Sequence, residues 1–196
     1  PSLVFGNLKA LANPDYRHQY YVDLTPTVGK GKGLLGGQNF KTVLVGGLGK
    51  GGKGYFALDI SIPGSITPDN VLWEFPNAAG QDDINDIGFS FSKPLVIRTN
   101  SVDEAESWIV IFGNGYDSAN GNAVLYMLNP MTGDIIKKIV ADNPYVDSGN
   151  GLSSPIAVDV NADEKVDFVY AGDLKGNMWK FDLTSTSYQN WDVAFE

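Results

Sequence analysis

The sequence predicts an all-β fold, a β-propeller represented by about three four-stranded blades. The first observation is composition. The 23 glycines and 10 prolines among 196 residues, with few long helical patterns, favour many short strands joined by turns. The second is a group of four strand-like segments that recurs about every sixty residues. With 43% hydrophobic and 12% aromatic residues, the chain can also fill one core of good size.

The first strand of each repeat follows a proline flanked by small or apolar residues: "LTPTVG" at Pro26, "SKPLVI" at Pro94 and "SSPIAV" at Pro155. The second strand is apolar and runs into glycine, at residues 41–47, 107–115 and 166–173. The third is rich in aromatic residues and has a polar residue at or next to its last position, at residues 54–60, 123–129 and 177–183. The fourth closes the unit, at residues 70–75, 134–140 and 191–195.

These repeats predict blades at about residues 20–76, 87–141 and 151–196, within a partial propeller domain over 20–196. Residues 1–19 form a leader in which we expect one short helix around "GNLKALAN", ended by Pro14. Because propellers close with about 4–8 blades, three blades leave open edges. We therefore expect the open edges to be covered either by another copy of the chain or by further blades of a larger protein.

The glycine-rich stretch "VGGLGKGGKGYF", residues 45–56, resembles two phosphate-binding fingerprints without fitting either. A phosphate loop must open a helix, whereas "YFALDIS" follows here and reads as a strand. Gly54 also stands where a Walker loop needs a hydroxyl. We therefore expect a hairpin whose lysines, Lys50 and Lys53, are solvated loop charges.

The net charge of −9 disfavours nucleic acid and anionic membrane surfaces as partners and favours cations. The absence of cysteine excludes disulfides, thiolate metal sites and cysteine nucleophiles. No apolar run approaches the roughly 18 residues that span a bilayer, so we expect no membrane insertion.

The acidic segment "DVNADEKVD", residues 159–167, is the strongest candidate site. Side-chain oxygens fall at Asp159, Asn161, Asp163 and Asp167, with the backbone carbonyl of Lys165 between the last two. Alternating oxygen ligands on one short loop can wrap a hard cation, and a flexible oxygen-rich loop suits calcium better than magnesium. The sequence therefore predicts a calcium site.

This loop is not an EF-hand, because Glu164 occupies the position that needs glycine and Tyr170 the position that needs a bidentate glutamate. The alternative is an acidic hairpin that uses Asx turns and binds no ion. Three carboxylates so close together repel one another, which favours the cation.

The other polar clusters are better explained as turn caps than as sites. They are Asp82, Asp83 and Asp86 in one segment and Asn114, Asp117, Asn120 and Asn122 in another. The single histidine, His18, has no nucleophile context, so a histidine-dependent triad is disfavoured. We predict no catalytic residues and no enzyme.

Several motifs together resemble one known family. They include "HQYYVDLTPTVG", "WIVIFGNGYDSANGNAVLYMLN" and "NGLSSPIAVDVNADEKVDFVYAGDLKGNMWKFDL", and the similarity runs from about Tyr16 to Phe195. The chain is similar to the C-terminal propeller domain of the PilY/PilC family, large type IV pilus biogenesis and tip-associated adhesin proteins of Gram-negative bacteria.

The resemblance implies a modified, quinoprotein-like propeller whose acidic loop binds calcium through Asp159, Asn161, Asp163, Lys165 and Asp167. It implies a role in pilus extension and retraction, surface adhesion and twitching motility, with pilin subunits and host or abiotic surfaces as partners. It places the protein outside the cytoplasm, at the cell surface, the pilus tip, or the outer membrane and periplasm.

The sequence departs from the family at two loop positions, Ala162 and Glu164, where glycines are common. A left-handed residue other than glycine costs roughly 1–2 kcal/mol, so we expect these two residues to weaken ion binding.

Two alternatives to the pilus function remain. One is a fragment of a calcium-containing quinoprotein dehydrogenase, because "LNPMTGDIIKK" resembles the docking repeat of those propellers. Only one good copy of that repeat is present, and there is no cysteine pair to cover a quinone. The other is a protein-binding scaffold without an ion.

Overall fold

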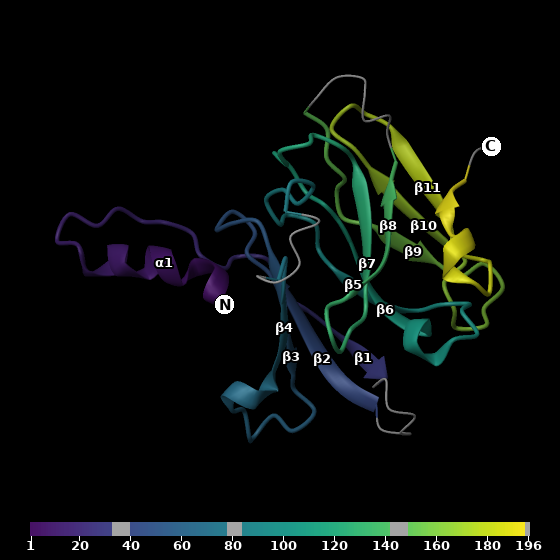
Figure 1. Cartoon of the computed structure of the whole chain (residues 1–196), viewed down its shortest axis with the longest axis horizontal. Helices are drawn as coiled ribbons and strands as arrows, with labels where there is room; N and C mark the ends of the chain where they lie inside the picture. The colour runs from purple at the N-terminus through teal and green to yellow at the C-terminus, as the bar shows by residue number, and fades with distance from the viewer. Residues whose placement is uncertain (33–39, 78–83, 142–148, 195–196) are drawn as a thin grey trace.

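The computed structural model describes residues 1–32, 40–77, 84–141 and 149–194. These residues form three separate four-stranded sheets in which neighbouring strands are antiparallel and consecutive in sequence (Figure 1). The prediction of an all-β propeller with three blades is confirmed.

Each sheet begins directly after one of the three prolines, at Pro26, Pro94 and Pro155. The first sheet contains β1 (Thr27–Lys32), β2 (Phe40–Gly47), β3 (Tyr55–Asp59) and β4 (Val71–Phe75). The middle sheet contains β5 (Leu95–Arg98), β6 (Trp108–Gly113), β7 (Val124–Leu128) and β8 (Ile135–Val140). The third sheet contains β9 (Ile156–Val158), β10 (Phe168–Gly172), β11 (Met178–Asp182) and β12 (Asp192–Val193).

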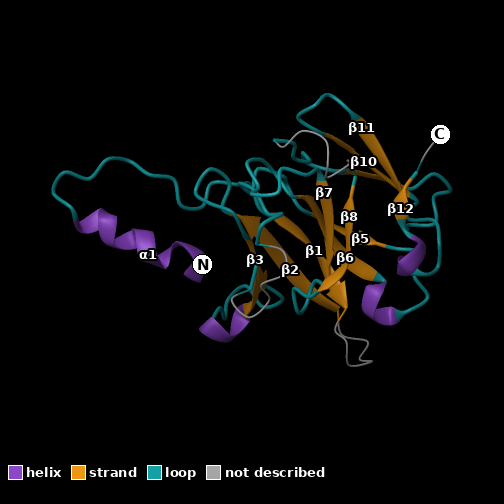
Figure 2. Cartoon of the chain, turned by 45° about the horizontal axis from the view of Figure 1, so that its top comes forward, coloured by secondary structure: helices purple, strands orange, loops and turns teal. Residues whose placement is uncertain are grey.

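The helical segments are short and lie outside the sheets (Figure 2). The leader contains η1 (Ser2–Val4), α1 (Phe5–Leu8) and η2 (Lys9–Ala12), and it extends away from the sheets. The single turns elsewhere are η3 (Pro68–Asn70), η4 (Glu104–Glu106) and η5 (Tyr188–Asn190). Asn13 is extended, as expected of a residue before proline, so the leader helix ends there. Within the described residues, no helix has both the length and the apolar character needed to cross a membrane.

The middle sheet is buried on both faces. One face packs against the first sheet, through Val110, Phe112, Val124, Tyr126 and Leu128. The opposite face packs against the third sheet, through Ile109, Ile111, Leu125 and Met127. A strand covered on both faces needs a continuous apolar run, and "VLYML" in β7 provides one.

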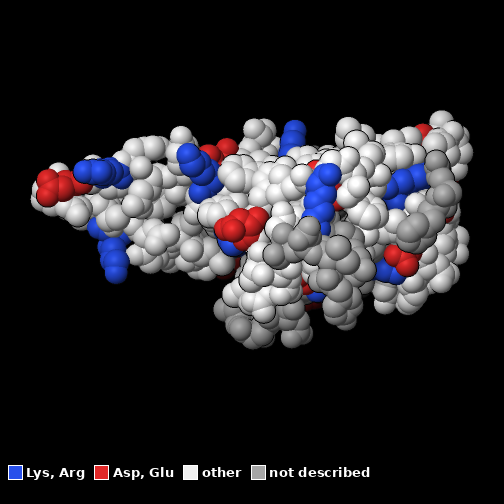
Figure 3. Space-filling view, turned by 90° about the horizontal axis from the view of Figure 1, so that it is seen from above, with Lys and Arg blue, Asp and Glu red and all other residues white. Residues whose placement is uncertain are grey.

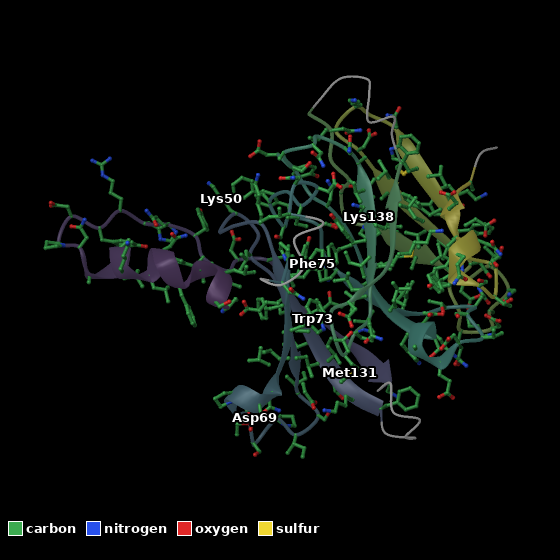
Figure 4. All side chains as sticks on the ribbon, viewed as in Figure 1. Lys50, Asp69, Trp73, Phe75, Met131 and Lys138 are labelled. Carbon is green, nitrogen blue, oxygen red and sulfur yellow. The ribbon has the colours of Figure 1, made fainter. Side chains whose placement is uncertain are left out.

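A tight contact joins β4 to the turn between β7 and β8. Figure 4 places Trp73, Phe75 and Met131 along the junction between the first and middle sheets. The indole Nε1 of Trp73 donates a hydrogen bond to the backbone oxygen of Pro130 at 3.0 Å. Gly133 has a φ of +75°, and a Cβ on this residue would lie 2.7 Å from Cγ of Trp73.

We expect Gly133→Ala to lower the free energy of unfolding by about 2 kcal/mol, because alanine is strained at this φ and its methyl group meets the indole ring. Urea denaturation followed by tryptophan fluorescence measures the loss. The control is Gly64→Ala, since Gly64 has ordinary φ and open space around it. Equal stability of the two variants would contradict the close contact.

Candidate metal-binding loop

The acidic loop, residues 159–167, connects β9 to β10 in the third sheet. Because Val158 pairs with Phe168, the two ends of the loop are brought side by side. The backbone N–H of Asp167 donates to the carbonyl of Val158 at 2.9 Å. The N–H of Val160 donates to Oδ2 of Asp167, also at 2.9 Å. The strand pair thus brings the first and last predicted ligands to one end of the sheet.

Asp159 organises the first half of the loop. Its Oδ1 accepts hydrogen bonds from the backbone N–H groups of Asn161 at 3.2 Å and Ala162 at 2.7 Å. Its Oδ2 accepts from the N–H of Glu164 at 2.8 Å. The carboxylate of Asp159 therefore accepts three backbone hydrogen bonds and holds the first half of the loop in a turn around it.

The two next alternate residues repeat the same local pattern. Oδ1 of Asn161 accepts from the N–H of Asp163 at 2.9 Å, and Oδ1 of Asp163 accepts from the N–H of Lys165 at 3.0 Å. These are Asx turns, in which a side chain caps the amide two residues ahead. A carboxylate has two oxygens with about four lone-pair sites, so these bonds leave acceptor capacity for a further ligand.

The backbone of the loop is left-handed at two residues that are not glycine. Ala162 has a φ of 62° and Glu164 a φ of 67°. These are the two positions at which the resemblance described above implies glycine. The side chain of Glu164 is 89% exposed, and its Oε2 lies 3.9 Å from Nη1 of Arg98. Glu164 therefore faces water and Arg98.

The loop carries more acidic than basic groups. Lys165 Nζ lies 3.5 Å from Oδ2 of Asp163, and the guanidinium of Arg98 lies 3.9 Å from Oε2 of Glu164. In the part of the chain that the structure describes, no three Asp, Glu, His or Cys side chains meet closely enough to form a metal cage. The predicted set, however, also uses an amide and a backbone oxygen. Such hard oxygen donors on one loop fit calcium in their chemistry.

Asp86, one of the other candidates, forms a structural ion pair. Its carboxylate is buried and lies 3.0 Å from Lys138 Nζ, and it also accepts from Nδ2 of Asn120 at 2.8 Å. The neighbouring candidates Asp82 and Asp83 lie outside the described residues.

Asn114 is a buried hub of the middle sheet. Its Oδ1 accepts from the N–H groups of Val124 at 3.1 Å and Leu152 at 2.9 Å, and its Nδ2 donates to the carbonyl of Asn122 at 2.9 Å. Each of these bonds is internal to the protein, so Asn114 serves the fold. His18 is exposed and packs edge-on against Tyr20 at 4.9 Å.

The glycine-rich stretch forms the hairpin between β2 and β3, with Gly49 at a φ of +60°. Lys50 is exposed, as expected of a solvated loop charge, but both lysines also have partners within the protein. Lys53 Nζ lies 3.4 Å from Oδ2 of Asp117 and 5.3 Å from the ring centroid of Phe89. Lys50 Nζ lies 4.7 Å from the ring centroid of Tyr20.

Sequence reasoning missed Asp173, which follows β10. Burial by itself raises the pKa of this carboxyl, but hydrogen bonds from Asn150, Asn177 and Trp179 outweigh burial and lower the pKa to about 2. The Nε1 of Trp179 donates to Oδ2 of Asp173 at 2.8 Å. The signal was local, because "GDLKGN" is a turn sequence directly after a strand.

We expect Asp173→Asn to be less stable than the wild type near pH 6, because an amide nitrogen cannot accept from these donors. A lowered pKa means that the carboxylate stabilises the fold above pH 3.8 and loses this effect as the pH falls toward 2. Thermal melts at pH 6, 4, 3 and 2 should show that the difference in melting temperature between the wild type and Asp173→Asn becomes smaller below pH 4. Asp69→Asn, at an exposed carboxylate, serves as control. A difference in melting temperature that does not change with pH would contradict the lowered pKa of Asp173.

On the one face that Figure 3 shows, the described Lys and Arg side chains form no continuous patch. They are dispersed among uncharged residues.

Together, the three blade-like sheets and the acidic loop define a β-propeller domain with a candidate cation site. A family model described as the PilY1 beta-propeller domain matches residues 1–194, and the chain belongs to this family. The predicted resemblance to PilY/PilC proteins is therefore confirmed.

Relatives of the chain are named as type IV pilus biogenesis factors. A PilY1 homolog of Xylella fastidiosa is 40% identical over the whole chain, and PilY1 of Pseudomonas aeruginosa is 42% identical over 93% of it. The chain spans only 13% and 15% of these two relatives. The crystal structure of the Pseudomonas aeruginosa PilY1 C-terminal domain matches with a TM-score of 0.77 and 36% identity, covering all of this chain and 39% of that one. These names favour the pilus family over the quinoprotein dehydrogenases.

Proposed function

We propose that this chain is a non-enzymatic, calcium-binding propeller domain of a type IV pilus biogenesis protein. Family membership supports the pilus role, and the acidic loop supports the ion. The observation that carries the proposal is Asp159, whose carboxylate already holds the N–H groups of Asn161, Ala162 and Glu164 in a closed turn. Such a turn presents alternate oxygens from one short segment, as calcium loops do.

The residues that would hold calcium are Asp159, Asn161, Asp163 and Asp167 through side-chain oxygens and Lys165 through its backbone oxygen. Bound calcium would supply positive charge that offsets the mutual repulsion of the carboxylates. The chain's own contribution is to close the turns and to hold Asp167 at the start of β10. An ion that binds only the ordered loop stabilises that order by its binding free energy.

At the level of the organism, we infer a role in pilus extension and retraction, surface adhesion and twitching motility. The partners are pilin subunits and host or abiotic surfaces, and the location is the pilus or the cell envelope. The names of the relatives as type IV pilus biogenesis factors support this placement. Calcium would act by ordering the acidic loop and so altering a surface that meets the pilus machinery.

The test is a thermal melt of the chain in EGTA, then in graded calcium, with magnesium as control. We expect the midpoint to rise in calcium, to saturate at a definite concentration, and to respond weakly to magnesium, which demands a stricter octahedral site. An unchanged midpoint across all calcium concentrations would overturn the calcium site.

The second candidate function is a protein-binding scaffold without an ion. One observation favours it: the oxygens of Asp159, Asn161 and Asp163 are already engaged with amides of the loop. An acidic hairpin built only on Asx turns would have the same bonds. The calcium melt separates the two candidates directly.

We expect Ala162→Gly to raise the free energy of unfolding by about 1 kcal/mol, because glycine adopts the φ of 62° without the cost that a Cβ imposes. Calcium affinity should rise as well if the loop binds it, since less strain opposes the ordered turn. The control is Ala105→Gly in η4, which has no positive φ and should lose stability. Equal losses in the two variants would contradict the strained backbone.

A further inference from the structure

Residues 98–102 run from the last residue of β5 into the loop that leads to β6, and they lie along the acidic loop of the third sheet. The N–H of Val166 donates to the carbonyl of Arg98 at 2.9 Å, and the N–H of Val102 donates to the carbonyl of Thr186 at 3.1 Å. Between these two backbone bonds lies the side chain of Asn100. The junction between two blades therefore passes directly beside the candidate ion site.

The side-chain amide of Asn100 points to three acceptors of the third sheet. Its Nδ2 lies 3.1 Å from the carbonyl of Val166, 3.3 Å from the carbonyl of Leu183 and 3.4 Å from Oδ1 of Asp167. Two N–H bonds can be shared among these three oxygens. Asn100 thus connects the middle sheet to the start of β10 and to the end of β11 in the third sheet.

Asp167 is the predicted ligand with the most restricted environment. The residue is only 4% exposed, and its Oδ2 is held by the N–H of Val160 at 2.9 Å. Its other oxygen, Oδ1, faces Asn100. A buried carboxylate held from both sides has a fixed orientation, and the donor on one of those sides comes from another blade.

We propose that Asn100 is a positioning residue for the ion site, and that ion binding at the acidic loop is coupled through Asn100 and Asp167 to the junction between the middle and third sheets. The inference rests on the proposed calcium function. Groups that orient a metal ligand commonly change metal affinity by 10–100-fold when they are removed. Because linkage is reciprocal, an ion that needs Asp167 in this orientation must also strengthen the junction.

The first experiment is a calcium titration by calorimetry on the chain and on two variants, Asn100→Ala and Asn70→Ala. We expect Asn100→Ala to weaken calcium binding about tenfold or more. Asn70 also donates from Nδ2 to a backbone carbonyl, that of Asp59 at 2.9 Å, but it lies in η3, between β3 and β4, and not beside the acidic loop. Asn70→Ala should therefore bind calcium as the wild type does.

The second experiment is amide hydrogen exchange with and without calcium. In the wild type, calcium should slow exchange at Val166 and, beyond the loop, at Val102, whose N–H bonds across the junction. In Asn100→Ala, the slowing should be confined to residues 159–167. This readout tests the coupling in the wild type even where the alanine variant folds poorly.

The outcomes separate this inference from the proposed function. A wild type that binds no calcium overturns the function and the inference with it. A wild type that binds calcium, with equal affinity in Asn100→Ala or with protection confined to the loop, overturns only the inference. Weakened binding in Asn100→Ala alone, together with calcium-dependent protection at Val102, supports it.

Discussion

Replacing Phe112 with alanine is expected to lower the free energy of unfolding by about 3–5 kcal/mol. Phe112 is fully buried, and its ring stacks on Tyr55 at a centroid distance of 4.0 Å. The rings of Tyr126 at 5.6 Å and Phe75 at 5.8 Å complete the cluster between the first and middle sheets. Alanine would leave a cavity among rigid rings that cannot collapse to fill it, and urea denaturation would measure the loss.

The control for this prediction is Phe5→Ala in the leader. Phe5 is 64% exposed, so its truncation should change stability by no more than about 0.5 kcal/mol. A Phe112→Ala variant that loses less than about 1 kcal/mol would contradict the view that the aromatic cluster holds these two sheets together.

Replacing Asp159 with alanine is expected to abolish the calcium dependence of thermal stability. The change removes a proposed ligand and the acceptor for three backbone N–H groups, those of Asn161, Ala162 and Glu164. If the wild type binds calcium, a concentration of 1,000 times its Kd adds about 4 kcal/mol of stability. Melts in EGTA and in saturating calcium should show that rise in the wild type and none in the variant.

Asp182→Ala is the matched control. Its Oδ1 accepts from the N–H of Thr184 at 2.8 Å, so it forms an Asx turn in the third sheet outside the acidic loop. The control should lose some stability and keep the whole calcium shift. Retention of that shift in Asp159→Ala would remove Asp159 from the ligand set.

The strands could be predicted from sequence almost to the residue. Each of the three sheets starts one residue after its proline, and the apolar run that ends on glycine was recognised in all of them. This succeeded because strand pairing within a blade is local, with short turns between consecutive strands. The repeat also gave the number of sheets before any contact was known.

The candidate site could be predicted only in part. The alternating ligands from Asp159 to Asp167 lie on one loop, so their spacing was visible in the sequence. Asn100 was not visible, because it is 67 residues from Asp167 and lies in a stretch, "IRTNSVDE", that has no recognisable ligand spacing. The positive φ of Ala162 and Glu164 was expected only from the departure from the family's glycines. Contacts between blades depend on packing, which the repeat itself does not encode.

The double burial of the middle sheet has a consequence for the order in which the chain comes apart. Opening the third sheet uncovers one face of β6 and β7, while the other face stays covered by the first sheet. Opening the middle sheet exposes both faces together and leaves each outer sheet without its core. The third sheet, with a three-residue strand at one edge and a two-residue strand at the other, is the part expected to detach first. Strands β6 and β7 would then be the last strands to unfold. The outer sheets would detach from them and re-form on them.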